Sequence, residues 1–203
     1  MSAAQLRIFG DSNSGNCLKV KWIADALAIP YAWVEVDVVA GGSRTPEMLA
    51  INPAGQVPSV VLADGRALAQ SNAILRYLAR GSRLLPEESF TQAKIDEWLF
   101  WEQYSHEPYV AVARFRMRYL GEPHESLDAK LVDRGNAALD RLEQHLAGAA
   151  FLVGESMTIA DIAILAYTRV AHEGGFDLGA RAHVRRWIAA CEAQLSLSPA
   201  VAA

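Results

Sequence analysis

The chain has 203 residues, 52% of them hydrophobic, which is enough for one large globular domain or two small ones with buried cores. Its 19 Lys and Arg residues against 23 Asp and Glu residues give a net charge of -4, and no basic run is dense enough to neutralise several phosphates, so nucleic acid is not an expected partner. The sequence shows neither a signal-peptide pattern nor an apolar run of membrane-spanning length, so we expect a soluble, cytoplasmic protein without a membrane partner.

The first elements alternate between strand and helix patterns. Residues 5–9 alternate apolar and polar side chains, and from Asn16 the apolar residues recur at helical spacing until Pro30 ends the run. Tyr31 to Val39 is rich in aromatic and β-branched residues, as strands are, and Thr45-Pro46-Glu47 is typical of the entry to a short helix. Two strands joined by a helix predict a parallel pair with a right-handed crossover.

A hairpin and a helix complete this first region. The turn Asn52-Pro53-Ala54-Gly55 leads into a predicted strand from Val57 to Leu62, and Asp64-Gly65 predicts a two-residue hairpin loop before the return strand Ala67-Leu68. A helix is expected from about Ser71 to Arg80. The resulting order, β-α-β-α-β-β-α, is the layout of a thioredoxin-like domain.

The remainder of the chain has helical patterns only. After residues 81–88, which break the periodicity, apolar stripes recur at helical spacing, and Pro108 is expected to kink or interrupt a long helix. The sequence Thr158-Ile159-Ala160-Asp161 is a capping-box pattern, to which we assign a structural role, and a last helix is expected from about Ala182 to Gln194.

These patterns define the expected fold class. We expect an α/β thioredoxin-like N-terminal domain over residues 1–80, a linker over residues 81–88, and an all-α helical bundle over residues 89–203.

Pro58 raises the possibility of a peptide-binding edge. Proline in a sheet is confined to a strand's first residue, an edge or a bulge, and Pro58 occupies the first position. If the Val57-Pro58 bond is cis, the backbone of Val57 is free to pair with an extended peptide; the commoner alternative is a trans proline at the start of an edge strand. Gln70 and Ser71, at a helix start, either cap that helix or hold a small carboxylate.

The segment NPAGQVPSVVLADGRALAQSNAILRYLA, residues 52–79, resembles the glutathione-binding signature of the soluble glutathione S-transferases. The loop Ser12 to Cys17 is similar to the serine-type loops of bacterial members related to the theta and phi groups. The resemblance covers the whole chain, since members pair a thioredoxin-like domain with a helical domain that carries a Thr-x-x-Asp capping box, here Thr158 to Asp161. It implies glutathione as co-substrate, a role in detoxification and a homodimer.

The resemblance also implies glutathione contacts. The backbone of Val57, beside cis-Pro58, would pair with the cysteinyl part of glutathione, and Gln70 and Ser71 would hold its γ-glutamyl carboxylate and amine. Its glycine carboxylate would be approached by two further side chains, Gln56 and Arg44. Arg44 occupies a position where many members have Lys or His.

The group that activates the thiol is expected between Ser12 and Cys17. A free thiol with a pKa of about 8.5 is only about 3% thiolate at pH 7, and one hydroxyl donor worth roughly 1.5–3 kcal/mol would lower that pKa by about one to two units. Members often carry the active serine two residues before a Pro or Asn at the helix start, which favours Ser14 ahead of Asn16. Ser12 and Asn16 are the alternatives, and a plain helix-capping role for either serine stays open.

Two cysteines and five histidines offer no metal site. Cys17 and Cys191 are too few for a disulfide framework and lack the Cys/His spacing of structural zinc, so no metal is expected.

An aromatic segment of the helical region supplies candidates for an electrophile pocket. By the family layout, Trp101, Tyr104, Tyr109 and Phe115 would face the first-domain site and line a pocket for a small, apolar electrophile. The alternative for each of them is helix core or dimer interface.

These observations lead to one functional hypothesis and its alternatives. We expect a glutathione transferase that lowers the thiol pKa of bound glutathione and conjugates it to a small, apolar electrophile. The alternatives are a glutathione-dependent peroxidase or dehalogenase, a thiol transferase that uses Cys17, and a non-catalytic binding or scaffold protein.

Overall fold

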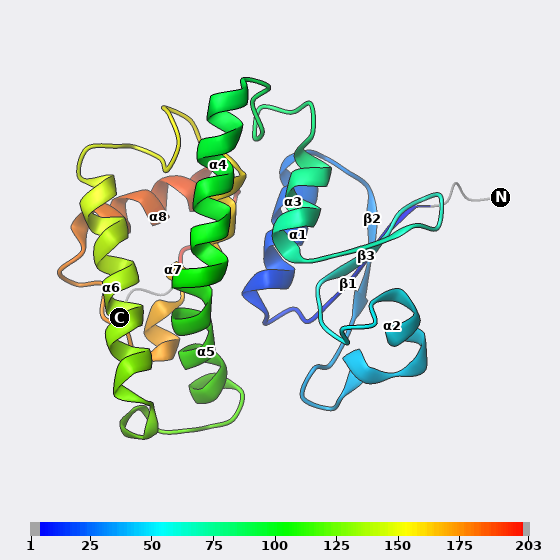
Figure 1. Cartoon of the computed structure of the whole chain (residues 1–203), viewed down its shortest axis with the longest axis horizontal. Helices are drawn as coiled ribbons and strands as arrows, with labels where there is room; N and C mark the ends of the chain where they lie inside the picture. Colours follow the sequence, from blue (N-terminus) through cyan, green and yellow to red (C-terminus); the bar gives the residue numbers. More distant parts are fainter. Residues whose placement is uncertain (1–4, 201–203) are drawn as a thin grey trace. The chain divides into compact units, whose positions relative to one another are not determined.

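The computed structural model describes residues 5–200 and divides the chain into two compact units, residues 1–85 and 86–203 (Figure 1). The boundary between the two units falls within residues 81–88, where the sequence lacks the helical spacing of apolar residues. None of the helices among residues 5–200 is both long and apolar enough to cross a membrane.

The first unit is a four-stranded mixed sheet with helices on both faces. In the strand order β2-β1-β3-β4, β1 is parallel to β2 and antiparallel to β3, and β4 is antiparallel to β3. Helices α1 and α3 pack together on one face and α2 on the other (Figure 1). The elements are β1 (Leu6–Gly10), α1 (Gly15–Ala26), β2 (Tyr31–Glu35), α2 (Pro46–Ile51), β3 (Ser59–Val61), β4 (Ala67–Ala69) and α3 (Ser71–Ala79). The predicted thioredoxin-like order and the parallel first pair are confirmed.

Side-chain alternation along β1 builds a core on each face of this sheet. Ile8 is fully buried in the cluster that includes Val20 of α1 and Ile74 of α3. Phe9 points to the opposite face and packs with Met48 of α2. Because successive side chains of a strand point to opposite faces, one short strand contributes to both cores and fixes the helices relative to the loop that follows it.

The second strand is shorter than its sequence suggests. Tyr31 to Val39 was expected to be extended throughout, but β2 ends at Glu35. Asp37 causes the difference: its carboxylate accepts a hydrogen bond from the Ala40 N–H at 2.9 Å, and its backbone carbonyl accepts one from the Gly42 N–H at 2.7 Å. A local turn therefore replaces the end of the strand, although its residues favour extended structure.

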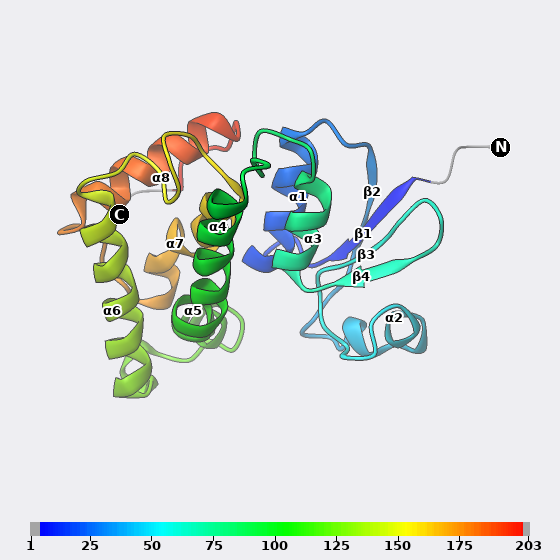
Figure 2. The same ribbon diagram turned by 45° about the horizontal axis from the view of Figure 1, so that its top comes forward.

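The second unit is helical. Its helices are α4 (Ser89–Trp101), α5 (Glu107–Arg118), α6 (Ala129–Leu146), α7 (Ile159–Thr168) and α8 (Ala182–Gln194). All ten residues of α7 are buried, and α4, α5 and α8 pack against it (Figure 2). The predicted all-helical class and the predicted span of the last helix are confirmed.

The expected interruption near Pro108 takes the form of a π-turn. Glu102–His106 forms one π-helical turn between α4 and α5, and α5 then begins at Glu107 with Pro108 in its first turn. Proline suits a first helical turn, where its missing N–H would have no partner within the helix.

Candidate functional site

Ser14 occupies the residue immediately before α1. Its backbone is extended, with φ -80° and ψ 120°, and its side chain makes no capping hydrogen bond to the helix. Asp11 fixes the conformation of this loop by two hydrogen bonds. The Ser14 N–H donates to the Asp11 carbonyl at 3.0 Å, and the Asn13 N–H donates to the Asp11 carboxylate at 2.8 Å. The alternative that Ser14 merely caps its helix therefore has no support in this geometry.

Ser12 is engaged by the end of β2. Its N–H and its hydroxyl both donate to Oε1 of Glu35, at 2.9 and 3.1 Å, and the Trp33 indole donates to Oε2 at 2.6 Å. Burial acts to raise the pKa of Glu35, but these hydrogen bonds outweigh it and hold the pKa below its usual value. The hydroxyl proton of Ser12 is therefore already donated to the Glu35 carboxylate.

Asn16 joins the starts of α1 and α3. Its side-chain oxygen accepts from Nζ of Lys19 at 2.8 Å and from the hydroxyl of Ser71 at 3.2 Å. Lys19 is fully buried and Ser71 is only 5% exposed. Because an ammonium can only donate, it fixes which end of the Asn16 amide is the accepting oxygen and which is the donating NH₂ group.

The segment before β3 has the form that the resemblance implies. The Val57-Pro58 peptide bond is cis. The Gln56 carbonyl accepts from the Asn52 side chain at 2.8 Å and from the Ser59 hydroxyl at 3.2 Å. Among residues 5–200, no hydrogen bond engages the backbone of Val57, so its N–H and carbonyl can pair with another extended backbone.

Gln70 has an unusual backbone conformation at the start of α3. Its φ of 70° lies in the left-handed region, which a residue other than glycine rarely adopts, and its side chain is exposed. The Gln70 side chain makes no capping hydrogen bond to α3. Strained residues of this kind concentrate at binding sites, where the strain positions a group for a ligand.

Arg44 lies over the turn that precedes Gln56. A Cβ placed on Gly55 would come within 2.7 Å of Cδ of Arg44, so a larger residue would clash with the Arg44 side chain. Gly55 also has φ +61°, a backbone conformation that favours glycine. Arg44 is exposed and brings a cation to this turn.

Cys17 sits inside α1 and is fully buried. Burial raises the pKa of its thiol to about 11, although a hydrogen bond with Ser14 acts in the opposite direction. At pH 8 only about one such thiol in a thousand is ionised. The geometry disfavours the thiol-transferase alternative, which needs an accessible thiolate.

We therefore expect iodoacetamide to leave Cys17 unmodified in the folded protein at pH 8 and to modify it after unfolding in urea, as peptide mass spectrometry would report. A Cys17→Ala variant should retain glutathione conjugation within about threefold, because the thiolate is the reactive form and this thiol does not ionise. Rapid alkylation of the native protein, together with loss of activity in Cys17→Ala, would restore the thiol-transfer alternative.

Three of the four aromatic candidates for the electrophile site line one pocket. Trp101, Tyr104 and Tyr109 border a pocket of about 390 Å³ within the helical unit, opposite cationic side chains of α6. Phe115 is not among its lining residues and instead stacks on Tyr119, with ring centroids 5.0 Å apart.

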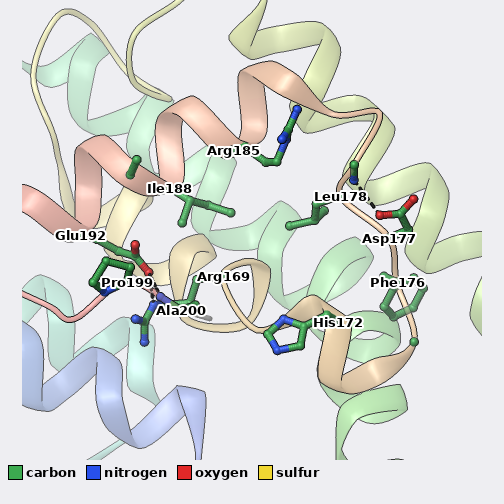
Figure 3. A pocket seen from close by; sticks show the side chains of 13 residues that line it. Arg169, His172, Phe176, Asp177, Leu178, Arg185, Ile188, Glu192, Pro199 and Ala200 are labelled. Atoms are coloured by element: carbon green, nitrogen blue, oxygen red, sulfur yellow. Dashed lines mark hydrogen bonds and ion pairs between the residues drawn. The ribbon is translucent and has the colours of Figure 1, made fainter. Parts of the chain in front are cut away.

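A second pocket of the helical unit contains no residue predicted from the sequence. It has a volume of about 550 Å³ and lies between the segment that follows α7, helix α8 and the chain near Ala200 (Figure 3). Leu178 and Ile188 supply apolar walls, while Arg169 and Glu192 form an ion pair at 2.7 Å at its edge. These three segments meet only in the folded chain, so no local sequence signal could have indicated the pocket.

No metal-binding cluster occurs in the described part of the chain. Within residues 5–200, no group of three or more His, Cys, Asp or Glu side chains could hold an ion.

Comparison with known proteins gives the same family for both units. A family profile described as "Glutathione S-transferase, N-terminal domain" matches residues 13–80, and one described as "Glutathione S-transferase, C-terminal domain" matches residues 98–194. Glutathione S-transferase 3 of Zea mays is 31% identical over 214 residues, which cover 98% of this chain and 95% of the relative.

Solved bacterial structures agree with these matches. A glutathione S-transferase from Pseudomonas fluorescens is 44% identical, with a TM-score of 0.92 over 97% of this chain and 99% of that one. Another, from Xanthobacter autotrophicus, is 45% identical, with a TM-score of 0.89 over 98% of this chain and 96% of that one. The chain belongs to the glutathione S-transferase family.

Proposed function

We propose that this glutathione transferase lowers the thiol pKa of bound glutathione with the Ser14 hydroxyl and directs the thiolate at a small, apolar electrophile. The observation that carries the proposal is the difference between the two serines of the loop: the Ser12 hydroxyl is bonded to the Glu35 carboxylate, whereas the Ser14 side chain does not cap α1 and, of the residues described, has a hydrogen bond only with the neutral Cys17 thiol.

The proposed glutathione site uses the backbone of Val57, just before β3, and the groups at the start of α3. The unpaired backbone of Val57 beside Pro58 supports pairing with the cysteinyl part of the tripeptide. The N–H groups at the start of α3, with Gln70 and Ser71, support binding of the γ-glutamyl carboxylate, because a helix N-terminus carries a partial positive charge.

The glycine carboxylate is assigned to the other end of the site. Arg44 supplies a cation over the turn that ends at Gly55, and the exposed side chain of Gln56 follows directly. Arginine can bind a carboxylate through two parallel hydrogen bonds, which makes it a stronger partner than a neutral side chain.

One donor is enough to change the ionisation of the bound thiol. A hydrogen bond from Ser14 to the thiolate, worth about 1.5–3 kcal/mol, would bring a thiol of pKa about 8.5 to between about 6.5 and 7.5. At pH 7 the thiolate fraction would rise from about 3% to between a quarter and three quarters. The positive end of α1 acts in the same direction.

Asn16 is the alternative donor within the same loop. Lys19 and Ser71 both donate to its side-chain oxygen, so the NH₂ group is the end of the amide that donates. We propose that Ser14 activates the thiol directly and that Lys19 and Ser71 keep the Asn16 amide in a fixed orientation beside it.

Two surfaces of the helical unit are candidates for binding the electrophile. Trp101, Tyr104, Tyr109 and Phe115 are the candidates from the sequence, and the apolar pocket of Figure 3 offers a further surface for an apolar group. Peroxide reduction and dehalogenation would use the same activated thiol and differ only in the second substrate.

We also propose that the protein is a cytoplasmic homodimer with a role in detoxification. The exposed Phe90 and Phe100 of α4 support association of two copies.

The proposal is tested by an ultraviolet titration of glutathione bound to the purified protein, which follows thiolate absorbance against pH. We expect an apparent thiol pKa at least about one unit below that of free glutathione. Binding with an unshifted thiol pKa, or no binding at all, would overturn the proposal in favour of a non-catalytic scaffold.

A further inference from the structure

The end of β2 lies beside the loop that carries Ser14. Strands β1 and β2 are parallel and pair residue by residue, so their last residues, Gly10 and Glu35, are opposite each other. The Val36 N–H donates to the Gly10 carbonyl at 2.9 Å, which continues the pairing past the end of β2. The loop that follows Gly10 therefore starts close to Glu35.

Glu35 anchors this loop through Ser12. The N–H and the hydroxyl of Ser12 both donate to Oε1 of Glu35, at 2.9 and 3.1 Å. Hydrogen bonds to a charged acceptor are stronger than those between neutral groups. The contact of the N–H matters more for the course of the chain, because it holds the backbone itself and does not depend on the serine side chain.

Trp33 fixes the orientation of the Glu35 carboxylate. The two residues are two positions apart in β2, so their side chains point to the same face of the sheet. The Trp33 indole donates to Oε2 of Glu35 at 2.6 Å. Its ring also packs at Gly10, where a Cβ would come within 2.7 Å of Cη2 of Trp33. The carboxylate is thus held at both oxygens, in part by a ring that packs where the loop begins.

The contact with Glu35 has a different role from the contacts made by Asp11. Asp11 accepts hydrogen bonds from Asn13 and Ser14, so it fixes the shape of the loop from within. Glu35 lies 23 residues from Ser12 along the chain, so its contact fixes the position of the loop relative to the sheet.

We propose that Glu35 is a positioning residue of the transferase reaction, because it anchors Ser12 and thereby keeps the Ser14 hydroxyl where it donates to the thiolate of glutathione. This inference rests on the proposed function of Ser14. In this scheme Glu35 does not touch the thiolate and acts only through the loop. A small displacement of a positioned group is costly, since a shift of about 1 Å can reduce a rate by about a hundredfold.

The position and the charge of Glu35 affect a nearby thiol in opposite directions. Loss of the anchor would raise the thiol pKa of bound glutathione, because Ser14 would no longer be held in place as donor. Loss of the charge alone would lower that pKa, since a neighbouring carboxylate disfavours a thiolate. Burial and, less strongly, the charge of Glu35 raise the pKa of the Cys17 thiol in the same region. The sign of the change therefore separates the two roles.

Glu35→Ala is compared with wild type by ultraviolet titration of bound glutathione. The Glu35 side chain is exposed, so the variant should fold, which circular dichroism checks. We expect its thiol pKa to lie at least about 0.5 units above that of wild type and its kcat/KM at pH 6.5 to be at least about threefold lower. Glu35→Gln keeps one accepting oxygen and should fall between the two.

Asp37→Asn is the matched control for charge. Asp37 is a second carboxylate close to Glu35, and asparagine keeps an oxygen that can accept from the Ala40 N–H, now at 2.9 Å. The thiol pKa of this variant should differ from that of wild type by less than about 0.2 units.

S-methylglutathione, which has no ionisable thiol, provides the control for binding. Its affinity, measured by isothermal titration calorimetry, should be the same in Glu35→Ala and in wild type within about twofold, because the anchor serves the thiolate. A loss of more than about tenfold would overturn the inference, since Glu35 would then maintain the whole site.

The titration also separates this inference from the proposed function. If the wild-type thiol pKa is depressed but that of Glu35→Ala is equal or lower, Glu35 is not a positioning residue, and Ser14 is unaffected as the proposed donor. If the wild-type thiol pKa is not depressed, the proposed function fails and the inference fails with it.

Discussion

Replacing Asp161 by alanine is expected to lower the free energy of unfolding by about 3 to 5 kcal/mol, the largest effect of any single substitution considered. Asp161 is fully buried, and its two oxygens accept four hydrogen bonds. The donors are the N–H groups of Leu152 at 2.9 Å and Thr158 at 2.8 Å, the Thr158 hydroxyl at 3.1 Å and the Trp187 indole at 2.9 Å. Alanine would leave the donors without an acceptor in a region that water does not reach.

Asp128→Ala provides the matched control. Asp128 caps α6 by accepting from the Lys130 N–H at 2.8 Å, but it is exposed, so water can replace the lost acceptor and the cost should be about 1 kcal/mol. Urea unfolding, followed by circular dichroism at one protein concentration, compares the two variants. If Asp161→Ala costs no more than Asp128→Ala, the buried hydrogen bonds do not hold the helical unit together.

The sequence predicted those elements whose signals are local. The capping box from Thr158 to Asp161 depends on neighbouring residues and is confirmed. The hairpin around Asp64-Gly65 is present, but Val61 pairs with Ala67 and the Leu62 N–H donates to the Arg66 carbonyl, so its loop has three residues, 63–65, where two were predicted. The last helix also has its expected bounds, because Gln194 ends a strongly periodic run that starts at Ala182. What the capping box alone could not predict is that Asp161 also accepts from Trp187 of α8, a contact that exists only after the helices pack.

The parts of the site that depend on contacts between segments far apart in the sequence could not be predicted. The spacing to Asn16 favours Ser14 over Ser12 in the sequence, but only the structure shows that Glu35 of the neighbouring strand accepts hydrogen bonds from Ser12. The buried Lys19 was not predicted as a site residue, since a lysine in a helix is normally solvated. The cationic side chains of α6 opposite Trp101 were missed because α6 is far from α4 along the chain.

Replacing Ser14 by alanine is expected to raise the thiol pKa of bound glutathione by about one to two units and to lower kcat/KM at pH 6.5 by about ten- to a hundredfold. The cause is loss of one hydrogen bond to the thiolate. Because that bond acts through ionisation, the difference between Ser14→Ala and wild type should shrink as the pH rises above about 8.5, where the thiol ionises without help. A pH series of conjugation rates with an activated aryl halide measures both effects.

Two further alanine variants decide which residue activates the thiol. Ser12→Ala should keep activity within about threefold, because the Ser12 hydroxyl already donates to Glu35 and its loss removes no donor from the thiolate. Asn16→Ala removes the acceptor that Lys19 and Ser71 share, so it should disturb the orientation of the loop at every pH instead of shifting the thiol pKa. If Asn16→Ala reproduces the pH-dependent loss while Ser14→Ala retains full activity, the activating donor is the Asn16 amide, and the proposal for Ser14 is wrong. A rate deficit in Ser14→Ala that is constant from pH 6 to pH 9 would contradict the hydrogen-bond mechanism as well, since a merely structural role of the serine has no reason to follow the ionisation of the thiol.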